Sequence, residues 1–234
     1  MQPKDWDPPP RPGEMTESRL IQAIVDGTFS INSTLPGERR LAEMLGVTRP
    51  TLREAMQRMA RDGWLEIHHG KATRVRDFWK EGGLGVSIAL VRHQLALPSD
   101  YAANLLAVRV LLAPTYTRQA VENKPDEIIT LLKGTDKLGE DADAFAAFDW
   151  QLHWLLTIHS GNPFFTHFIN SVQGLYELLG VRYFESKDTR AHSMNFYQEL
   201  LSAAEAGDGL GAELLTKRVM RESREFWMEI GQNN

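Results

Sequence analysis

Cysteine is missing from this 234-residue sequence altogether. Its absence excludes disulfide bonds, thiolate metal sites and cysteine nucleophiles, and it fits a reducing compartment such as the cytoplasm. Long apolar runs are missing too, because the longest, "LLAVRVLLAP", carries Arg109 in its middle and is too short to cross a bilayer. Residues 1–15 are rich in proline and lack the apolar core of a signal peptide. We therefore expect a mobile N-terminal segment, 1–15, on a cytoplasmic protein that does not enter a membrane.

The signatures of common enzyme classes are also absent. The sequence has no G-x-S-x-G nucleophile elbow, no phosphate-binding loop and no dinucleotide-binding fingerprint. Acidic pairs such as Asp141 and Asp143 lie at the expected start of a helix, where carboxylates stabilise the helix dipole. The sequence therefore predicts a protein that is not an enzyme and needs no cofactor.

Positive charge, by contrast, is concentrated in one region. The whole chain has a net charge of −5, whereas residues 36–76 have nine Lys or Arg against five Asp or Glu, a net of +4. Residues 1–35 have a net charge of −2 and residues 77–234 a net charge of −7. A basic module attached to an acidic body indicates two functions in one chain, and the basic module favours a polyanionic partner.

The basic region has the element order of a winged helix-turn-helix. Apolar spacing predicts a first helix over 16–28, with Thr16 as its N-cap. Two further helices follow, one ended at Gly46 and the next capped by Thr48. Residues 64–75 read as two short strands joined by a turn that contains Gly70. The stripe expected to face the interior of the last helix is Leu52, Met56 and Met59.

This order would place arginine and short polar side chains where a DNA-binding helix needs them. A helix that enters the major groove contacts phosphates and guanine edges through residues near its N-terminus. The stretch "VTRPTLRE" supplies such residues, and Gly70 permits a close backbone approach at the wing tip. Arginines on helices are often only solvated, which is our interpretation of Arg58 and Arg61. We expect double-stranded DNA to be contacted by Arg39, Thr48, Arg49, Thr51, Arg53, His69, Gly70 and Lys71.

Residues 35–65, "LPGERRLAEMLGVTRPTLREAMQRMARDGWL", resemble the signature of the GntR family of transcriptional regulators, L-P-x-E-R-x-L-A followed by G-V-[ST]-R-x-[TP]-[LV]-R-E-A. The resemblance implies DNA contacts from Arg39, Thr48, Arg49, Thr51, Arg53, His69 and Gly70, which are the residues expected above without Lys71. It also implies a homodimer on a palindromic operator, since a two-fold protein matches a two-fold site. Pro50 stands where some members of the family have a polar residue.

The acidic part of the chain has a different pattern. Residues 77–95 contain the pair Gly82-Gly83 and are expected to form a linker. Residues 96–234 are helical in pattern, with roughly six or seven helices and no strand-like alternation. The predicted fold class is therefore mainly α: an N-terminal winged helix-turn-helix over 16–76, with a small β-hairpin, and a C-terminal all-α bundle with room for a core pocket.

The segments "NLLAVRVLLAP", "GLYELLGVRYF" and "RESREFW" resemble the fatty-acid-responsive FadR subfamily of the GntR family. The resemblance implies a regulator of fatty-acid metabolism whose effector, long-chain acyl-CoA, releases the dimer from DNA. Repression is the expected mode, and activation of some promoters stays open. Val219 and Met220 stand in place of a Tyr-Gly pair. By matching positions, the implied effector contacts are Arg109, Tyr183, Lys217, Arg218, Ser223 and Trp227.

The same residues also permit a plainer interpretation. Trp, Phe and Leu at helical spacing are more often core than ligand-binding residues, and Ser223 alone would be an ordinary surface hydroxyl. An acyl-CoA is nevertheless physically reasonable, because an apolar tunnel gains about 0.8 kcal/mol per buried methylene. Arg109, Lys217 and Arg218 would then face the phosphates of the CoA group.

A second branch of the family, which binds a divalent metal beside a small carboxylate through one Asp and three His, is the alternative. Asp149 and His153 have the i, i+4 spacing of two such ligands. Tyr197 and Val219 stand near the positions where the other two histidines are expected. We therefore predict no metal site, with Asp149 on the helix surface and His153 in the core or pocket wall. A different small carboxylate, with or without a metal, stays open as the effector.

Overall fold

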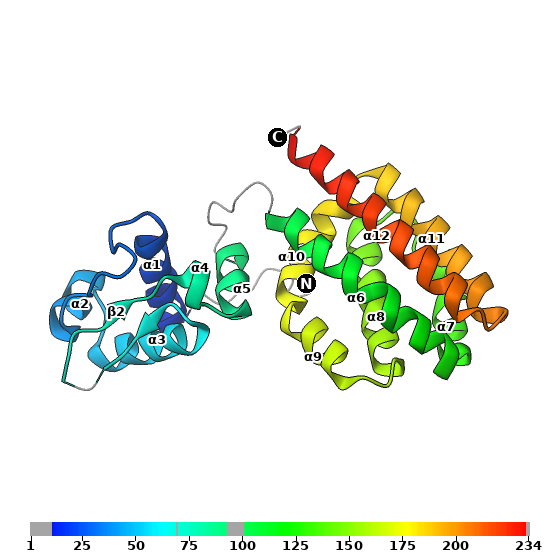
Figure 1. Ribbon diagram of the computed structural model, residues 1–234. Coiled ribbons are helices and arrows are strands. Elements are labelled where there is room, and N and C mark those ends of the chain that lie inside the picture. The colour runs from blue at the N-terminus through cyan, green and yellow to red at the C-terminus, as the bar shows by residue number, and fades with distance from the viewer. Residues whose placement is uncertain (1–10, 69, 93–100, 233–234) are drawn as a thin grey trace, which may run out of the picture. The chain divides into compact units, whose positions relative to one another are not determined.

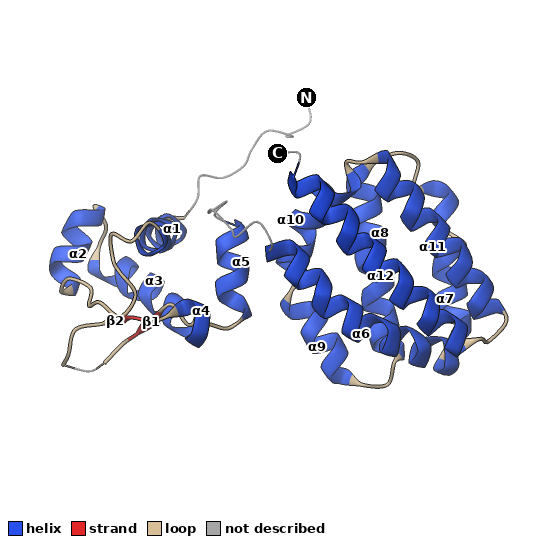
Figure 2. Cartoon of the chain, turned by 45° about the horizontal axis from the view of Figure 1, so that its top comes forward, coloured by secondary structure: helices blue, strands red, loops and turns tan. Residues whose placement is uncertain are grey.

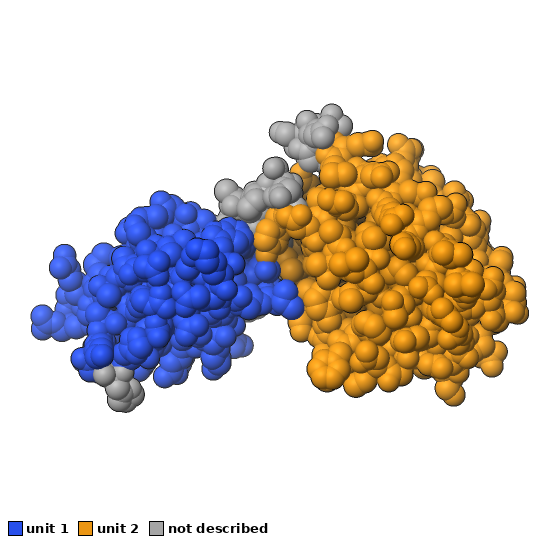
Figure 3. All heavy atoms as spheres, in the orientation of Figure 1, with its two compact units in different colours: residues 1–96 blue, residues 97–234 orange. Residues whose placement is uncertain are grey.

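The computed structural model describes residues 11–68, 70–92 and 101–232. The chain divides into two compact units, residues 1–96 and residues 97–234 (Figure 3). Each unit has its own hydrophobic core and is described by itself. Within the described residues, no helix combines the length and the apolar character that a membrane span requires.

Unit 1 is a winged helix-turn-helix, as the element order predicts (Figure 1). The fold class, mainly α with a small hairpin, is thereby confirmed. Residues that pack the three main helices together include Leu20, Leu41, Leu52 and Met59, all of them fully buried. The elements are α1 (Pro12–Val25), α2 (Glu38–Leu45), α3 (Arg49–Asp62), β1 (Leu65–Glu66), β2 (Arg74–Val75), α4 (Phe78–Glu81) and α5 (Leu84–Arg92).

The first helix begins earlier than the sequence pattern predicts. Pro12 occupies its first turn, where a missing N–H costs little. Thr16 is therefore not the N-cap but a buried residue within α1, and its hydroxyl donates a hydrogen bond of 2.6 Å to the carbonyl oxygen of Pro12. Residues 12–15, expected to be mobile, are helical.

The turn between α2 and α3 is encoded residue by residue. Gly46 ends α2 in the left-handed conformation, with φ of 68°, which glycine adopts without a Cβ clash. Thr48 caps α3 as predicted, because its hydroxyl accepts a hydrogen bond of 3.3 Å from the backbone N–H of Thr51. These two residues fix where α3 starts and therefore which side chains its first turn presents.

The wing is built from more chain than the sequence predicts. Strands β1 and β2 pair antiparallel, with Leu65 opposite Val75 (Figure 2). A bridge from Thr34 to Arg74 adds the segment before α2 to the other side of β2. The backbone carbonyl of Val75 also accepts a hydrogen bond of 2.9 Å from the N–H of Asn32. The hairpin is thus tied to the loop that leads into α2.

The segment 77–95, expected to be a linker, contains α4 and α5. Phe78 of α4 is buried, and its ring lies 4.7 Å from the ring of Trp64. At least α4 therefore packs as part of the winged unit. Residues 93–95 lie outside the described residues.

Unit 2 is an all-α bundle. Helices α6 and α12 lie side by side and run antiparallel (Figures 1 and 2), and Arg118 of α6 reaches Glu213 of α12 at 3.2 Å. The core gathers apolar side chains from α6, α7, α8, α10, α11 and α12. The elements are α6 (Tyr101–Asn123), α7 (Pro125–Leu132), the 3-10 turn η1 (Thr135–Lys137), α8 (Ala142–His159), α9 (Pro163–Ser171), α10 (Gln173–Phe184), α11 (Lys187–Glu205) and α12 (Gly209–Gln232).

Candidate nucleic-acid interface and buried cavity

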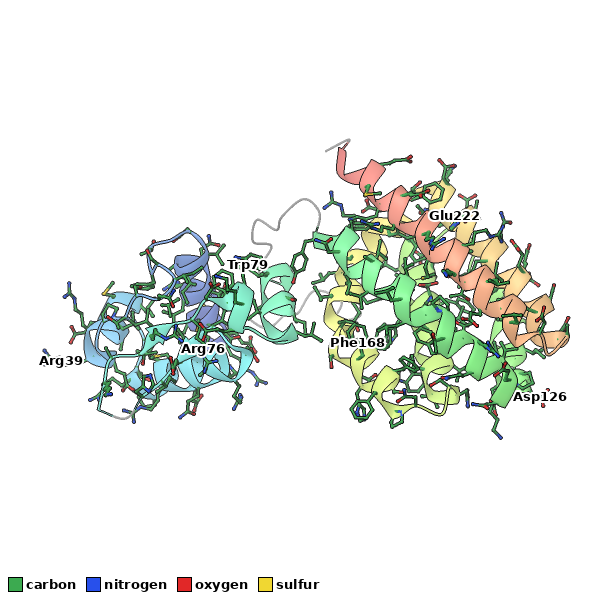
Figure 4. All side chains as sticks on the ribbon, viewed as in Figure 1. Arg39, Arg76, Trp79, Asp126, Phe168 and Glu222 are labelled. Atoms are coloured by element: carbon green, nitrogen blue, oxygen red, sulfur yellow. The ribbon has the colours of Figure 1, made fainter. Side chains whose placement is uncertain are left out.

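A groove of about 550 Å³ lies between α2, α3 and the wing of unit 1. Four of the residues that the sequence predicts to contact DNA line this groove: Arg39, Arg49, Gly70 and Lys71. The side chain of Arg39 is 85% exposed and extends away from α2 (Figure 4). Cationic side chains from two helices and the wing thus border one concave surface. His69 lies outside the described residues.

The arginines of α3 are held by an acid that sequence reasoning missed. Arg53 donates two hydrogen bonds to Glu38 at the start of α2, with Nη2–Oε2 at 2.7 Å and Nε–Oε1 at 3.3 Å. Arg49 Nη2 lies 3.8 Å from the same Oε2 atom. The hydrogen bonds from Arg53 hold the pKa of Glu38 below its ordinary value, so the acid is charged at neutral pH. Glu38 therefore fixes the direction of two nominated side chains.

The two nominated threonines are paired with each other. The hydroxyl oxygens of Thr48 and Thr51 lie 2.8 Å apart, next to the N-cap hydrogen bond. Thr51 also borders a second groove between α1 and α3, together with Arg58 and Arg61. The first turn of α3 thus presents short hydroxyl groups beside the arginine side chains.

Arg58 is not merely a solvated arginine. Its Nε donates a hydrogen bond of 2.7 Å to Glu17 of α1, and the Glu17 side chain is only 13% exposed. The pair links α3 to α1. Arg58 therefore stabilises the arrangement of the helices, away from the groove that borders the wing.

Unit 2 contains a cavity of about 60 Å³ whose wall is mostly apolar. Four of the six nominated effector residues line it: Arg109 of α6, Tyr183 of α10, and Ser223 and Trp227 of α12. Lys217 and Arg218 are exposed on α12, and Arg218 Nη2 pairs with Glu199 of α11 at 2.7 Å. The helices thus bring four of the predicted effector-binding residues, Arg109 among them, to one cavity. The other two, Lys217 and Arg218, lie on the surface.

A buried charged cluster lies at one side of the cavity. Asp149 is only 6% exposed, so the expectation that it lies on the helix surface is wrong. Arg109 Nη2 lies 3.5 Å from Asp149 Oδ2, the Tyr197 hydroxyl donates to Oδ1 at 2.9 Å, and the Tyr176 hydroxyl donates to Oδ2. Burial works against the charged carboxylate, but the guanidinium and the two hydroxyl donors hold the pKa of Asp149 below its ordinary value.

His153 lies in the core, as expected, at 1% exposure. Its Nδ1 lies 2.8 Å from the hydroxyl of Tyr116. Burial, reinforced by the positive charge of Arg109, lowers the pKa of His153 to about 3. The imidazole is therefore neutral at physiological pH, and the charged pair beside it is Arg109 with Asp149.

The donor set around Asp149 does not suit a metal ion. Among the described residues, no group of three His, Asp or Glu side chains lies close enough to hold one. Both carboxylate oxygens of Asp149 instead accept hydrogen bonds from tyrosine hydroxyls. The carboxylate of Asp149 is thus occupied by hydrogen bonds within the bundle.

Comparisons with known proteins agree with both units. Residues 12–75 match the bacterial regulatory proteins of the gntR family, and residues 76–233 match the FadR C-terminal domain. A fatty acid metabolism regulator protein of Shewanella denitrificans is 38% identical over 219 residues, covering 94% of this chain and 92% of that protein. One from Klebsiella pneumoniae is 38% identical over 216 residues, covering 92% of this chain and 90% of that protein.

A solved structure adds a likeness of fold. The protein described as Lar, which controls the expression of the Listeria monocytogenes agr system, is 15% identical and covers 95% of this chain with a TM-score of 0.67. The family matches and the curated relatives are regulators, so the chain is a DNA-binding transcription regulator and not an enzyme. It belongs to the GntR family of bacterial regulatory proteins and has a C-terminal domain of the FadR type.

Proposed function

We propose that this protein regulates fatty-acid metabolism in the cytoplasm as a homodimer that binds a palindromic operator and is released by long-chain acyl-CoA. In this proposal residues 16–76 read the DNA, residues 77–95 connect the two parts, and residues 96–234 bind the effector and contribute to the dimer. The observation that carries it is the apolar cavity of unit 2, which is lined by Arg109, Tyr183, Ser223 and Trp227.

DNA binding would use the groove between α2, α3 and the wing. Its cations neutralise phosphates and release counterions, while the first turn of α3 reaches base edges in the major groove. Arg39 and Arg49 would supply guanidinium groups and Gly70 and Lys71 the wing contact, with Arg53, Thr48, Thr51 and His69 completing the surface. Two copies related by a two-fold axis would read two half-sites.

Effector binding would use the burial of an acyl chain, because each buried methylene contributes about 0.8 kcal/mol. The cavity of about 60 Å³ is much smaller than typical ligand sites, which span about 300–1,000 Å³. A long acyl chain would therefore bind a form of unit 2 with more widely separated helices. A ligand that binds one form better than another shifts the population toward it, which gives the effector a means to act on DNA binding.

The CoA group would lie outside the cavity. Lys217 and Arg218 immediately precede the lining residues Val219 and Met220 on α12 and are exposed. Their charges are available to phosphates at the surface, although Arg218 would have to exchange its carboxylate partner Glu199 for a phosphate. Arg109 in the cavity wall would remain with Asp149.

The experiment is a titration of the purified protein bound to an operator duplex. Operator sequences are first selected from a random library, and affinity is then measured by fluorescence anisotropy at fixed salt. We expect long-chain acyl-CoA to weaken operator binding about 5- to 150-fold, the usual range of allosteric coupling, and free CoA to have no effect. Unchanged operator affinity across all acyl-CoAs would show that the effector is wrong.

The small volume of the cavity also favours a second candidate. A small carboxylate from sugar or amino-acid metabolism needs less space than a long acyl chain, so it would require less movement of the helices that line the cavity of about 60 Å³. The same titration distinguishes the two, because a small carboxylate would release the operator where acyl-CoA does not. Thermal-shift measurements with each class give an independent readout, since a ligand of the folded state raises the unfolding temperature.

A further inference from the structure

The guanidinium group of Arg74, in strand β2 of the wing, joins three separate parts of unit 1. Its Nε donates a hydrogen bond of 2.6 Å to Glu66 of β1, and its Nη1 donates one of 2.7 Å to Asn32 in the loop before α2. Its Nη1 and Nη2 also donate to the two carboxylate oxygens of Glu81 in α4, at 3.3 and 2.9 Å. One side chain of the wing thus holds two carboxylates and an amide at the same time.

The geometry of this group favours a single arrangement. Isolated ion pairs on a protein surface contribute little, because water screens them. Arg74, Glu66 and Glu81 instead form a connected group of half-buried side chains. The hydrogen bonds from Arg74 hold the pKa values of both glutamates below their ordinary value, so both carboxylates are charged at neutral pH. A planar guanidinium that is bound at several points keeps one orientation, which a lysine ammonium does not reproduce.

Glu66 extends the group to the edge of the groove that is predicted to bind DNA. Its Oε2 accepts the hydrogen bond from Arg74, and its Oε1 lies 3.3 Å from Nε2 of His68. His68 lines the groove between α2, α3 and the wing, together with Gly70 and Lys71. The orientation of Arg74 therefore bears on the wing residues that border this groove.

The opposite end of the group lies on a firmly packed element. Glu81 Oε1 also accepts a hydrogen bond of 3.1 Å from the backbone N–H of Asp77, at the start of α4. Phe78 of the same helix is buried against Trp64. The wing strands, by contrast, have only two residues each, and so short a hairpin is marginally stable by itself. Its position therefore depends on contacts outside the hairpin, such as those that Arg74 makes to α4 and to the loop before α2 (Figure 2).

We infer that Arg74 is a positioning residue of the DNA interface, which holds the wing against α4 so that Gly70 and Lys71 border the groove. Arg74 acts through the wing and not by touching DNA itself, because three protein partners occupy its guanidinium group. The inference rests on the wing contact with DNA in the proposed function and is independent of the effector. Loss of the Arg74 guanidinium should therefore remove the same phosphate contact that loss of Lys71 removes.

The test measures the operator affinity of the full-length protein by fluorescence anisotropy at several salt concentrations. Arg74→Lys keeps the positive charge but loses the planar fork, so its effect on DNA binding does not come from net charge. Lys71→Ala removes the wing cation and should lower the slope of log affinity against log salt by about one. We expect Arg74→Lys to weaken operator binding about fivefold and to lower this slope by about one as well.

A double-mutant cycle shows whether Arg74 acts through the wing. Arg74→Lys combined with Lys71→Ala should bind the operator within about twofold of Lys71→Ala alone, because one contact is lost only once. A general loosening of unit 1 would instead add to the effect of Lys71→Ala. Arg118→Lys is the matched control, since Arg118 also bridges two glutamates, Glu122 and Glu213, but in unit 2. It should leave the operator affinity and the slope unchanged.

The outcomes separate this inference from the proposed function. If Lys71→Ala changes neither affinity nor slope, the proposed wing contact fails and the positioning role fails with it. If Lys71→Ala weakens binding but Arg74→Lys does not, if their losses add in the double variant, or if Arg118→Lys weakens binding equally, the role of Arg74 is overturned while the wing contact stands. Should Arg74→Lys unfold, Glu81→Gln keeps Arg74 and removes its ion pair with α4, and an unchanged slope in this variant overturns the inference.

Discussion

Arg53 of α3 and Glu38 of α2 form an ion pair joined by two hydrogen bonds, of 2.7 and 3.3 Å, on the face of unit 1 that is nominated for DNA binding. An acid at this place opposes the attraction between the surface and phosphates. We therefore expect Glu38 to contribute to DNA binding by orienting Arg53, since a planar guanidinium that is bound at two points has one orientation. Glu38 therefore lowers the affinity for DNA somewhat but fixes the position of Arg53. It also restrains Arg49, whose Nη2 lies 3.8 Å from Glu38 Oε2.

Glu38→Gln should consequently raise non-specific affinity and lower specificity. Removing one negative charge favours binding to any duplex, while the freed arginines lose their common orientation. We expect the ratio of operator affinity to scrambled-duplex affinity to fall about tenfold, measured by fluorescence anisotropy at several salt concentrations. Glu43→Gln is the matched control, an exposed acid of the same helix at 3.8 Å from Arg39. Equal effects of the two substitutions would exclude a positioning role for Glu38.

Arg49→Ala should abolish specific operator binding, whereas Arg61→Ala should leave it nearly intact. Arg49 lines the groove beside the wing, and a bidentate contact to a base contributes about 1–3 kcal/mol of discrimination. Arg61 lies in the last turn of α3 and borders the other groove, toward α1. Competition assays with operator and random duplex measure both variants. The assignment of the DNA-binding face is wrong if the two variants lose the same amount of specificity.

The winged unit was predictable because its boundaries are encoded locally. Gly46 and Thr48 end one helix and begin the next through their own backbone and hydroxyl, and neither effect needs distant parts of the chain. The pair Gly82-Gly83 was misleading for the opposite reason. A Cβ on Gly63 would lie 2.7 Å from the Cα of Gly82, so these glycines permit close packing between the end of α3 and the end of α4. A pair of glycines in a sequence is therefore compatible both with close packing of the backbone and with a flexible linker.

The polar cluster of unit 2 was only partly predictable. Asp149 follows Phe145 by four residues and precedes Leu152 by three, so it lies on the apolar stripe of α8, and this spacing already indicated burial. What the spacing cannot reveal is the set of partners. Tyr176, Tyr197 and Arg109 come from three other helices and meet Asp149 only when the bundle is formed.

The buried neutral His153 should make the stability of unit 2 depend on pH. Its pKa is about 3 when folded against an ordinary value of 6.5, so between these pH values the unfolded chain binds a proton that the folded chain does not. The contribution of His153 to the free energy of unfolding is therefore fully present above about pH 6.5 and is lost as the pH falls toward 3. From pH 7 to pH 5 we expect this residue to contribute a loss of about 2 kcal/mol in the free energy of unfolding.

Urea unfolding followed by circular dichroism checks this loss, because unit 2 holds most of the long helices. His153→Gln should reduce the difference between pH 7 and pH 5, whereas His167→Gln, which changes an exposed histidine of α9, should keep it. The Tyr116 hydroxyl retains a hydrogen-bonding partner in the glutamine side chain. An unaltered pH dependence in His153→Gln would mean that another group causes it.

Asp149→Asn tests whether the buried pair with Arg109 is required for folding. The substitution keeps the size of the side chain but leaves the guanidinium, 12% exposed, without its counter-charge. Breaking a buried ion pair from one side costs about 3–5 kcal/mol, so we expect a loss of that order in the free energy of unfolding. Asp143→Asn, at an exposed position in the first turn of the same helix, should cost less than about 1 kcal/mol.

A third variant separates charge from shape in this cluster. Combining Asp149→Asn with Arg109→Met removes both charges, and removal of a whole buried pair is often nearly neutral. The double variant should therefore recover most of the stability that Asp149→Asn loses. If it is instead as unstable as the sum of its two single substitutions, the cluster is held together by the tyrosine hydrogen bonds to Asp149 rather than by the attraction between Arg109 and the carboxylate.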